Sequence, residues 1–155
     1  MHHSWSKQEF EISTDPARID LRAVHDFLTN SYWAGGIPVK TVQRSIDHSL
    51  CFGVYRGQEQ IGFARVISDQ ATFAYLADVF ILEPYRGRGL SRWLMQCILA
   101  HPDLQGLRRW MLATRDAHGL YEYYGFSRMK SPERWMELHH PDIYLKIATP
   151  DVPKK

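Results

Sequence analysis

The sequence predicts a single α/β domain, residues 1–155, built on a mixed and mostly antiparallel sheet. Residues 49–82 read as three apolar runs separated by two tight turns, which is typical of an antiparallel meander. A helical pattern over 90–100 then separates the third run from a strand at 109–113, and such a crossover makes these two strands parallel. A length of 155 residues is that of one domain and leaves too little chain for a second buried core.

Two helices are expected ahead of the meander. Thr14-Asp15-Pro16 offers an N-cap followed by proline at the first helical position, and apolar residues then recur at helical spacing as far as about Asn30. A weaker helical pattern starts near Pro38. The stretch before the first cap is polar with scattered charge, and no element is assigned to it.

The rest of the chain completes the domain. The run at 72–82 is almost continuously apolar, so we expect it to be central in its sheet. Ser131-Pro132 supplies a turn for a final hairpin. The expected elements are strands 49–56, 60–68, 72–82 and 109–113, helices 90–100 and 119–124, a hairpin pairing 126–129 with 134–138, and a frayed tail over 149–155.

Composition and charge exclude several classes of protein. Hydrophobic residues make up 45% of the chain and charged residues 23%, as in a packed domain rather than a disordered chain. The net charge of +2 argues against wrapping of nucleic acid or binding to an anionic membrane. No run approaches the roughly 18 apolar residues of a membrane helix, and the N-terminus lacks the apolar core of a signal peptide. We therefore expect a cytoplasmic protein with neither nucleic acid nor membrane as a partner.

The cysteine and histidine patterns indicate neither disulfides nor a metal site. Cys51 and Cys97 each lie in an apolar run, where reduced core cysteines are usually found. The eight histidines show no metal-ligand spacing, and the adjacent pair at 139–140 would diverge along a strand. We expect no bound metal.

The chemically informative motif lies between the buried third strand and the helix that follows it. It reads Arg86-Gly87-Arg88-Gly89-Leu90-Ser91. Backbone N–H groups at a helix N-terminus attract an anion, glycines let the backbone approach a phosphate, and the arginines add positive charge. The motif lacks the Gly-Lys-Ser/Thr ending of a P-loop and the third glycine of a dinucleotide fingerprint. It therefore predicts a diphosphate cradle of another kind.

At these residues the sequence resembles the GNAT superfamily of N-acetyltransferases. The signature of that family, Arg/Gln-x-x-Gly-x-Gly/Ala, reads here as Arg86-x-x-Gly89-x-Ser91, where the small serine replaces Gly or Ala. The segment 117–126, Ala-His-Gly-Leu-Tyr-Glu-Tyr-Tyr-Gly-Phe, is similar to the family's Ala-x-x-Leu-Tyr-x-x-x-Gly-Phe. The resemblance covers about 49–138 and implies the acyl-CoA N-acyltransferase fold, with helices on both faces of the sheet.

The resemblance also implies a co-substrate, acetyl-coenzyme A, and residues that contact it. The motif from Arg86 to Ser91 would hold the pyrophosphate, and the pantetheine arm would pair with the backbone of the preceding strand. Tyr121 matches the family's general acid beside the sulfur, and a phenol carries its proton at neutral pH. The expected contacts with acetyl-coenzyme A are made by Val79, Phe80, Ile81, Arg86, Gly87, Arg88, Gly89, Leu90, Ser91, Thr114 and Tyr124.

Asp78 is the candidate for a second catalytic residue. It interrupts an apolar strand, where a carboxylate must be hydrogen-bonded, paired or neutralised. Two interpretations are open: Asp78 takes a proton from the attacking amine, or it forms an ion pair with Arg65 on a neighbouring strand.

The acceptor pocket in this family is formed by the loop between the first two helices and by the last hairpin, which contribute Tyr32, Trp33 and Trp135 here. The alternative is that these aromatics cover the core or a dimer contact. The implied reaction is direct transfer of an acetyl group to a primary amine of a small molecule in a ternary complex, and a homodimer is possible. A non-catalytic coenzyme A sensor and a protein or peptide acetylase are the rival functions.

Overall fold

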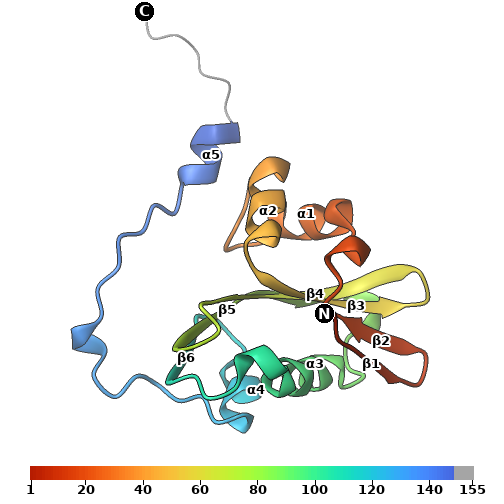
Figure 1. The fold of residues 1–155 in the computed structure, drawn as a ribbon. Helices are drawn as coiled ribbons and strands as arrows, with labels where there is room; N and C mark the ends of the chain where they lie inside the picture. Colours follow the sequence, from red (N-terminus) through yellow and green to blue (C-terminus); the bar gives the residue numbers. More distant parts are fainter. Residues whose placement is uncertain (149–155) are drawn as a thin grey trace, which may run out of the picture.

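The computed structural model describes residues 1–148, with side chains through residue 145, and shows a six-stranded sheet in which spatial order follows chain order (Figure 1). Neighbouring strands from β1 to β5 are antiparallel, and β6 is parallel to β5. This confirms the mixed, mostly antiparallel sheet. The strands are β1 (Ser4–Lys7), β2 (Phe10–Ser13), β3 (Leu50–Arg56), β4 (Glu59–Ser68), β5 (Phe73–Ile81) and β6 (Arg109–Leu112).

Helices cover both faces of the sheet, as expected. In Figure 1, α1 and α2 lie above the sheet, whereas α3 and α4 lie below it. Each face of the sheet has its own apolar core, because successive side chains of a strand point to opposite faces. Phe52 packs in the core between the sheet and α3, and Phe63 packs in the core between the sheet and the pair α1 and α2. The helices are α1 (Leu21–Thr29), α2 (Val39–Asp47), α3 (Leu90–Ala100), α4 (His118–Tyr123) and α5 (Ile143–Ala148).

The N-terminal hairpin of β1 and β2 was not predicted from the sequence. Phe10 and Ile12 are buried, whereas the residues of β1 are largely exposed. Each strand of the hairpin has four residues, and so short a run does not allow a strand to be identified by its alternation of apolar and polar side chains. The hairpin forms because β3 offers an edge, along which β2 pairs antiparallel.

The start of the first helix differs from the prediction. Asp15 and Pro16 begin only a 3₁₀ turn, Pro16–Arg18, with the Asp15 carboxylate accepting a hydrogen bond from Ala17 N–H. The α-helix begins at Leu21, where Asp20 provides a second cap through the N–H of Ala23. The sequence pattern predicted one long helix starting at the first of these two caps. In the structure, an extended Ile19 separates the 3₁₀ turn from α1. Its end at Asn30 is confirmed.

The predicted final hairpin is wrong. Within residues 126–142 the chain forms one 3₁₀ turn, Pro132–Arg134, and then runs away from the sheet to α5 (Figure 1). Proline at the first position favours a 3₁₀ turn over a tight hairpin turn, so residues 134–138 do not return to 126–129. The frayed tail predicted over 149–155 lies outside the described residues. None of the helices in the described part is long and apolar enough to cross a membrane.

Candidate active site

A cavity opens where β5 and β6 separate at their carboxyl ends. The two strands pair only as far as Leu76 and Leu112, although β5 continues to Ile81. Beyond that point lies a cavity of about 650 Å³, which we call the splay cavity. Its walls are β5 residues 75–79, the chain at 112–117 that follows β6, and the loop between α1 and α2. The main-chain edge of β5 that faces the cavity is therefore outside the β5–β6 ladder.

Asp78 lies on a β-bulge in the wall of this cavity. The pairing of β4 with β5 shifts register between Phe63 and Arg65, so that two residues of β5 oppose one residue of β4. At this bulge Asp78 has a φ of 55°, in the left-handed region that few non-glycine residues adopt. The bulge turns the Asp78 side chain toward the loop between α1 and α2.

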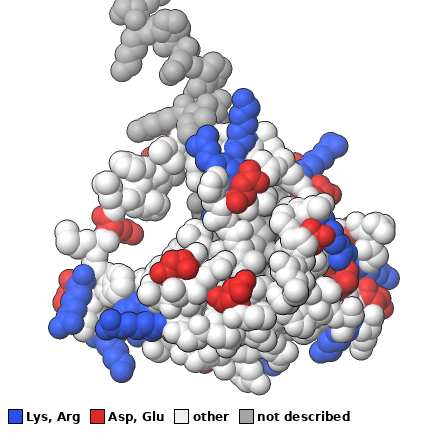
Figure 2. Space-filling view, in the orientation of Figure 1, with Lys and Arg blue, Asp and Glu red and all other residues white. Residues whose placement is uncertain are grey.

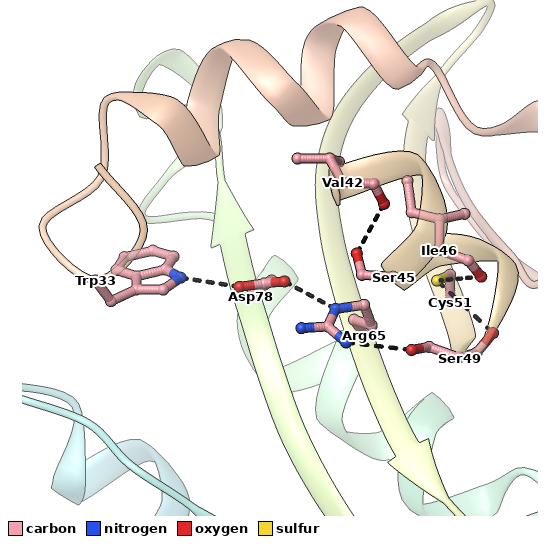
Figure 3. A network of polar contacts seen from close by, with 8 residues as sticks. All are labelled: Trp33, Val42, Ser45, Ile46, Ser49, Cys51, Arg65 and Asp78. Atoms are coloured by element: carbon pink, nitrogen blue, oxygen red, sulfur yellow. Dashed lines mark hydrogen bonds and ion pairs between the residues drawn. The ribbon is translucent and has the colours of Figure 1, made fainter. Parts of the chain in front are cut away.

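Both carboxylate oxygens of Asp78 are bound by protein donors (Figure 3). Trp33 Nε1 donates to Oδ1 at 2.9 Å from the loop, and Arg65 Nε donates to Oδ2 at 2.8 Å from β4. Arg65 also donates to Ser49 Oγ at 3.2 Å. The side chains of Arg65 and Asp78 are 16% and 10% exposed, so the ion pair proposed from the sequence is present and largely shielded from water. This chain of contacts fixes Trp33 to the bulge.

Tyr121 lies in α4 and lines the splay cavity, near Tyr32 of the loop between α1 and α2. The residue is 8% exposed. Burial, and then the nearby Tyr32, raise the pKa of Tyr121 above its ordinary value of 10.0. The phenol therefore retains its proton at neutral pH and can act as a hydrogen-bond donor or acid toward a group in the cavity.

The glycines of the 86–91 motif form an open cradle at the N-terminus of α3. Gly87 and Gly89 have φ values of 78° and 76°, and Gly89 is the N-cap residue. A Cβ atom at either position would meet nothing within 4 Å, so there is space above the backbone. No side chain caps α3, and the first amides of a helix have no partner within the helix. Unpaired amides of this kind can bind an anion, and they follow the carboxyl end of β5, where the splay cavity also opens.

The arginines near the cradle are held in different ways. Arg86 Nε donates to the carbonyl of Ile81 at 2.8 Å, which fastens the loop to the end of β5. Arg88 lies over the ring of Tyr85 and 3.9 Å from the carboxylate of Glu9. Both arginines are exposed, but Arg86 is held by its hydrogen bond to Ile81, so Arg88 is the more available of the two for a ligand.

Not all the residues predicted for the site line the splay cavity. Tyr32, Trp33, Asp78, Val79, Thr114 and Tyr121 line it. Trp135 does not: without the final hairpin it lies at another hollow, beneath the guanidinium of Arg109. Tyr124 also lies outside, because its hydroxyl donates to the carbonyl of Arg92 on α3. Phe80 and Ile81 have buried side chains, so they can face a ligand only through their backbone.

Sequence reasoning missed several residues of the cavity wall, among them Tyr75, Arg115, Asp116 and Tyr144. Tyr144 reaches the cavity from α5, and Arg115 stacks on the ring of Tyr32 at 3.9 Å. The contact of Tyr144 depends on the path of the chain after residue 126, which no local pattern indicates. Thr114 has a role besides lining the wall, since its Oγ1 accepts a hydrogen bond from Ala117 N–H at the start of α4.

The cysteines do not belong to this site. Cys51 and Cys97 are buried free thiols, and burial raises the pKa of each to about 12. A thiol with such a pKa is a poor nucleophile at neutral pH. Among the residues that the structure describes, no group of three or more His, Cys, Asp or Glu side chains could hold a metal ion.

Comparisons with known proteins agree with this geometry. Residues 47–128 match the family model of the acetyltransferase (GNAT) domain. A protein of Gibberella zeae, provisionally assigned as an acetyltransferase, is 33% identical over 82% of this chain and 88% of its own length. A crystal structure from Xanthomonas campestris, provisionally assigned to the GNAT acetyltransferases, is 52% identical, with a TM-score of 0.87 over 90% of this chain and 99% of that one.

More distant structures share the fold. An acetyltransferase structure from Deinococcus radiodurans, also provisionally assigned, has a TM-score of 0.70 at 20% identity, covering 96% of this chain and 98% of that chain. A GNAT acetyltransferase from Elizabethkingia anophelis, solved with acetyl-CoA bound, has a TM-score of 0.61 at 13% identity, covering 84% and 88% of the two chains. The family match, the close relatives and the shared fold establish that this chain belongs to the GNAT acetyltransferases.

Proposed function

We propose that this protein transfers an acetyl group from acetyl-CoA to a primary amine of a small molecule, by direct attack within a ternary complex. The observation that carries the proposal is the position of two features at one end of β5. The splay cavity and the glycine cradle of α3 lie where a ligand with a diphosphate and a long extended arm can reach both.

The residues present fit such a co-substrate. The space above Gly87 and Gly89 admits a pyrophosphate close to the amides of α3, and Arg88 is placed to add a charge-assisted hydrogen bond. Beyond Leu76 the edge of β5 can pair with an amide-containing arm as it would with a strand. An amide of the bulge at 78–79 can donate to a developing oxyanion, a contribution of a few kcal/mol in general.

Tyr121 is proposed as the acid that protonates the departing thiolate. Its ring lines the cavity, and its raised pKa keeps the proton in place until a stronger base forms beside it. Because the pKa lies above 10.0, the activity that depends on this proton stays constant through neutral pH. It declines only in strongly alkaline solution.

For Asp78 we propose positioning rather than proton abstraction. Both of its oxygens already accept hydrogen bonds, one from Trp33 and one from Arg65. Asp78→Asn separates the two roles. Loss of a general base lowers kcat by roughly 100-fold or more and changes its dependence on pH. Loss of positioning raises KM for the amine and leaves the pH profile of kcat in place, which is the expected result.

The aromatic side chains of the cavity support a small organic amine as the acceptor. Tyr32, Trp33, Tyr75 and Tyr144 line the cavity, and Asp116 adds a carboxylate. Aromatic faces and a carboxylate attract an organic cation. Tyr144 from α5 narrows the approach that an extended peptide would need, and this favours a small molecule over a protein acceptor.

The test is release of thiol from acetyl-CoA across a panel of small amines and lysine-containing peptides. We expect turnover with small amines, and a loss of roughly 100-fold or more in kcat for Tyr121→Phe with unchanged affinity for coenzyme A. Tyr123→Phe is the matched control, because Tyr123 belongs to the same helix but is 68% exposed and does not line the cavity. Binding of coenzyme A without thiol release for any amine would make the protein a sensor and overturn the proposal.

A further inference from the structure

Two arginines line the splay cavity, and their surroundings differ. Arg65 is paired with the carboxylate of Asp78 at 2.8 Å, so its charge is compensated within the protein. Arg115 forms no ion pair within residues 1–145, although Asp116 is its neighbour in the chain. The cavity wall therefore carries a guanidinium that is available to a negatively charged group of a ligand.

The guanidinium of Arg115 is held in place by aromatic rings. Its Cζ atom lies 3.9 Å from the centroid of the Tyr32 ring, a cation–π contact that joins the chain after β6 to the loop between α1 and α2. Tyr32 packs edge-on against Trp33, with ring centroids 5.0 Å apart, and Trp33 donates to Asp78 on β5 (Figure 3). A guanidinium over a ring can still donate hydrogen bonds from its edge. Arg115 therefore loses little side-chain freedom when it binds a ligand.

The position of Arg115 favours a role toward the acceptor. The glycine cradle lies between β5 and α3, whereas Arg115 contacts the loop between α1 and α2, whose aromatic side chains line the cavity. Asp116 also lines the cavity and brings a negative charge. Two successive residues thus present a cation and an anion to the same space, which suits a ligand that itself carries both charges.

The rest of the surface offers no extended field of positive charge on the face that Figure 2 shows. Lys and Arg side chains occur there in separate groups, with Asp and Glu side chains among or between them. The net charge of the chain is only +2. The molecule as a whole therefore attracts an anion weakly, and binding of an anion in the cavity depends on Arg115.

The form of the site favours a carboxylate over a phosphate. A carboxylate has one negative charge and accepts two parallel hydrogen bonds from a single guanidinium. A phosphate monoester has a charge between about −1.5 and −2 at neutral pH, so one arginine would leave part of that charge uncompensated beside Asp116.

We propose that the acceptor is a small primary amine that also carries a carboxylate, and that Arg115 binds this carboxylate. The inference rests on the acetyl transfer proposed above and names the substrate class of the same cavity. Arg115 is then the residue that selects an amino acid over the corresponding amide or simple amine.

The first experiment compares acceptors that differ only in the acid group. Thiol release from acetyl-CoA is measured with 4-aminobutanoate and 4-aminobutanamide, and with tyrosine and tyrosinamide. We expect kcat/KM for the better acid to exceed that for its amide by roughly 100-fold, because the amide cannot accept the charge-assisted pair of hydrogen bonds. The amine of each amide is the less basic one and is more often neutral, so amine protonation cannot produce a preference for the acid.

The second experiment changes the arginine. Arg115→Gln is expected to remove the preference for the acid, with kcat/KM for the amides and affinity for coenzyme A unchanged. Arg115→Lys keeps the charge without the paired donors and is expected to restore part of the preference. Arg22→Gln is the matched control, because Arg22 is an exposed arginine on α1 that does not line the cavity.

Charge reversal provides a variant whose result cannot come from misfolding. Arg115→Glu is expected to prefer 1,4-diaminobutane to 4-aminobutanoate, which is a gain of activity toward a new acceptor.

The outcomes separate this inference from the proposed function. A wild-type protein that uses the amides as well as the acids, or an Arg115→Gln variant that keeps the preference, overturns the inference and leaves acetyl transfer to small amines standing. A preference for 2-aminoethyl phosphate over every carboxylate also overturns it. Absence of thiol release with all of these acceptors overturns the proposed function and the inference together.

Discussion

The two sides of the splay cavity are formed in different ways. The side proposed to face the co-substrate consists of β5, the glycine cradle and α3, which are consecutive in the sequence. The side proposed to face the acceptor consists of the loop between α1 and α2, the chain after β6, and α5, which lie far apart in the sequence. The first side is specified by local sequence, and the second by tertiary contacts. The expected consequence is a cofactor site with fixed geometry beside an acceptor site that tolerates change.

The strongest test of the local side is Gly89→Val. The side chain would occupy the space above the backbone, where a diphosphate is proposed to lie, so affinity for coenzyme A is expected to decrease by about 1000-fold, or about 4 kcal/mol. Calorimetric titration measures it. Gly57→Val is the matched control: Gly57 also has a positive φ and open space, but it lies in the turn between β3 and β4. The Gly57→Val variant is expected to have the same backbone strain but to retain its affinity for coenzyme A. Equal losses in both variants would show that strain alone is responsible.

The link between the two sides is tested by Arg65→Met. This substitution leaves the carboxylate of Asp78 largely buried without its cation, and removing one partner of such a pair costs about 3 kcal/mol of unfolding free energy. Denaturant titration measures the loss. Combining Arg65→Met with Asp78→Asn is expected to recover part of it, since no uncompensated charge remains. A single variant as stable as the wild type would mean that the pair makes no contribution.

The acceptor side is tested by Tyr144→Ala. Loss of a ring from the cavity wall is expected to raise KM for the amine by about 10-fold, or about 1.4 kcal/mol, without changing affinity for coenzyme A. Ile143→Ala is the control on the same helix, because Ile143 is 44% exposed and does not line the cavity. If Tyr144→Ala weakened coenzyme A equally, the division into two sides would be wrong.

The smallest effect is expected for Trp33→Phe. The substitution keeps an aromatic ring but removes the indole N–H that donates to Asp78, and a hydrogen bond at such an exposed position contributes about 1 kcal/mol. We expect KM for the amine to rise by roughly fivefold at a nearly constant kcat. Steady-state kinetics with varied amine measure both. A large decrease in kcat instead would place Asp78 in the proton transfer.

The difference between the locally specified side and the side built from distant segments also explains which features could be predicted from the sequence. Gly89 caps α3 and Leu90 begins it, shortly after β5 ends at Ile81, so both the motif and its position at a helix N-terminus could be predicted from the sequence. The pairing of Asp78 with Arg65 was one of two interpretations, because adjacent antiparallel strands bring such side chains near each other, whereas the bulge that brings Asp78 to Arg65 could not be predicted.

The residues that sequence reasoning misplaced depend on distant contacts. The position of Trp135 followed from a hairpin that residues 126–138 do not form, and Tyr144 reaches the cavity only through the path of an extended segment. Strand propensity indicates that a segment can pair, but not which edge is available to it. The β1–β2 hairpin was missed for the same reason.

The burial of both cysteines has a practical consequence for measuring this enzyme. Cys51 is 5% exposed and Cys97 is 3% exposed, and both thiols hold their protons at neutral pH. A disulfide reagent added during turnover should therefore titrate the coenzyme A released and almost nothing of the folded protein. When the chain unfolds, two thiols per chain become reactive. One colorimetric reagent can thus report catalysis in native buffer and unfolding in denaturant, with no label attached.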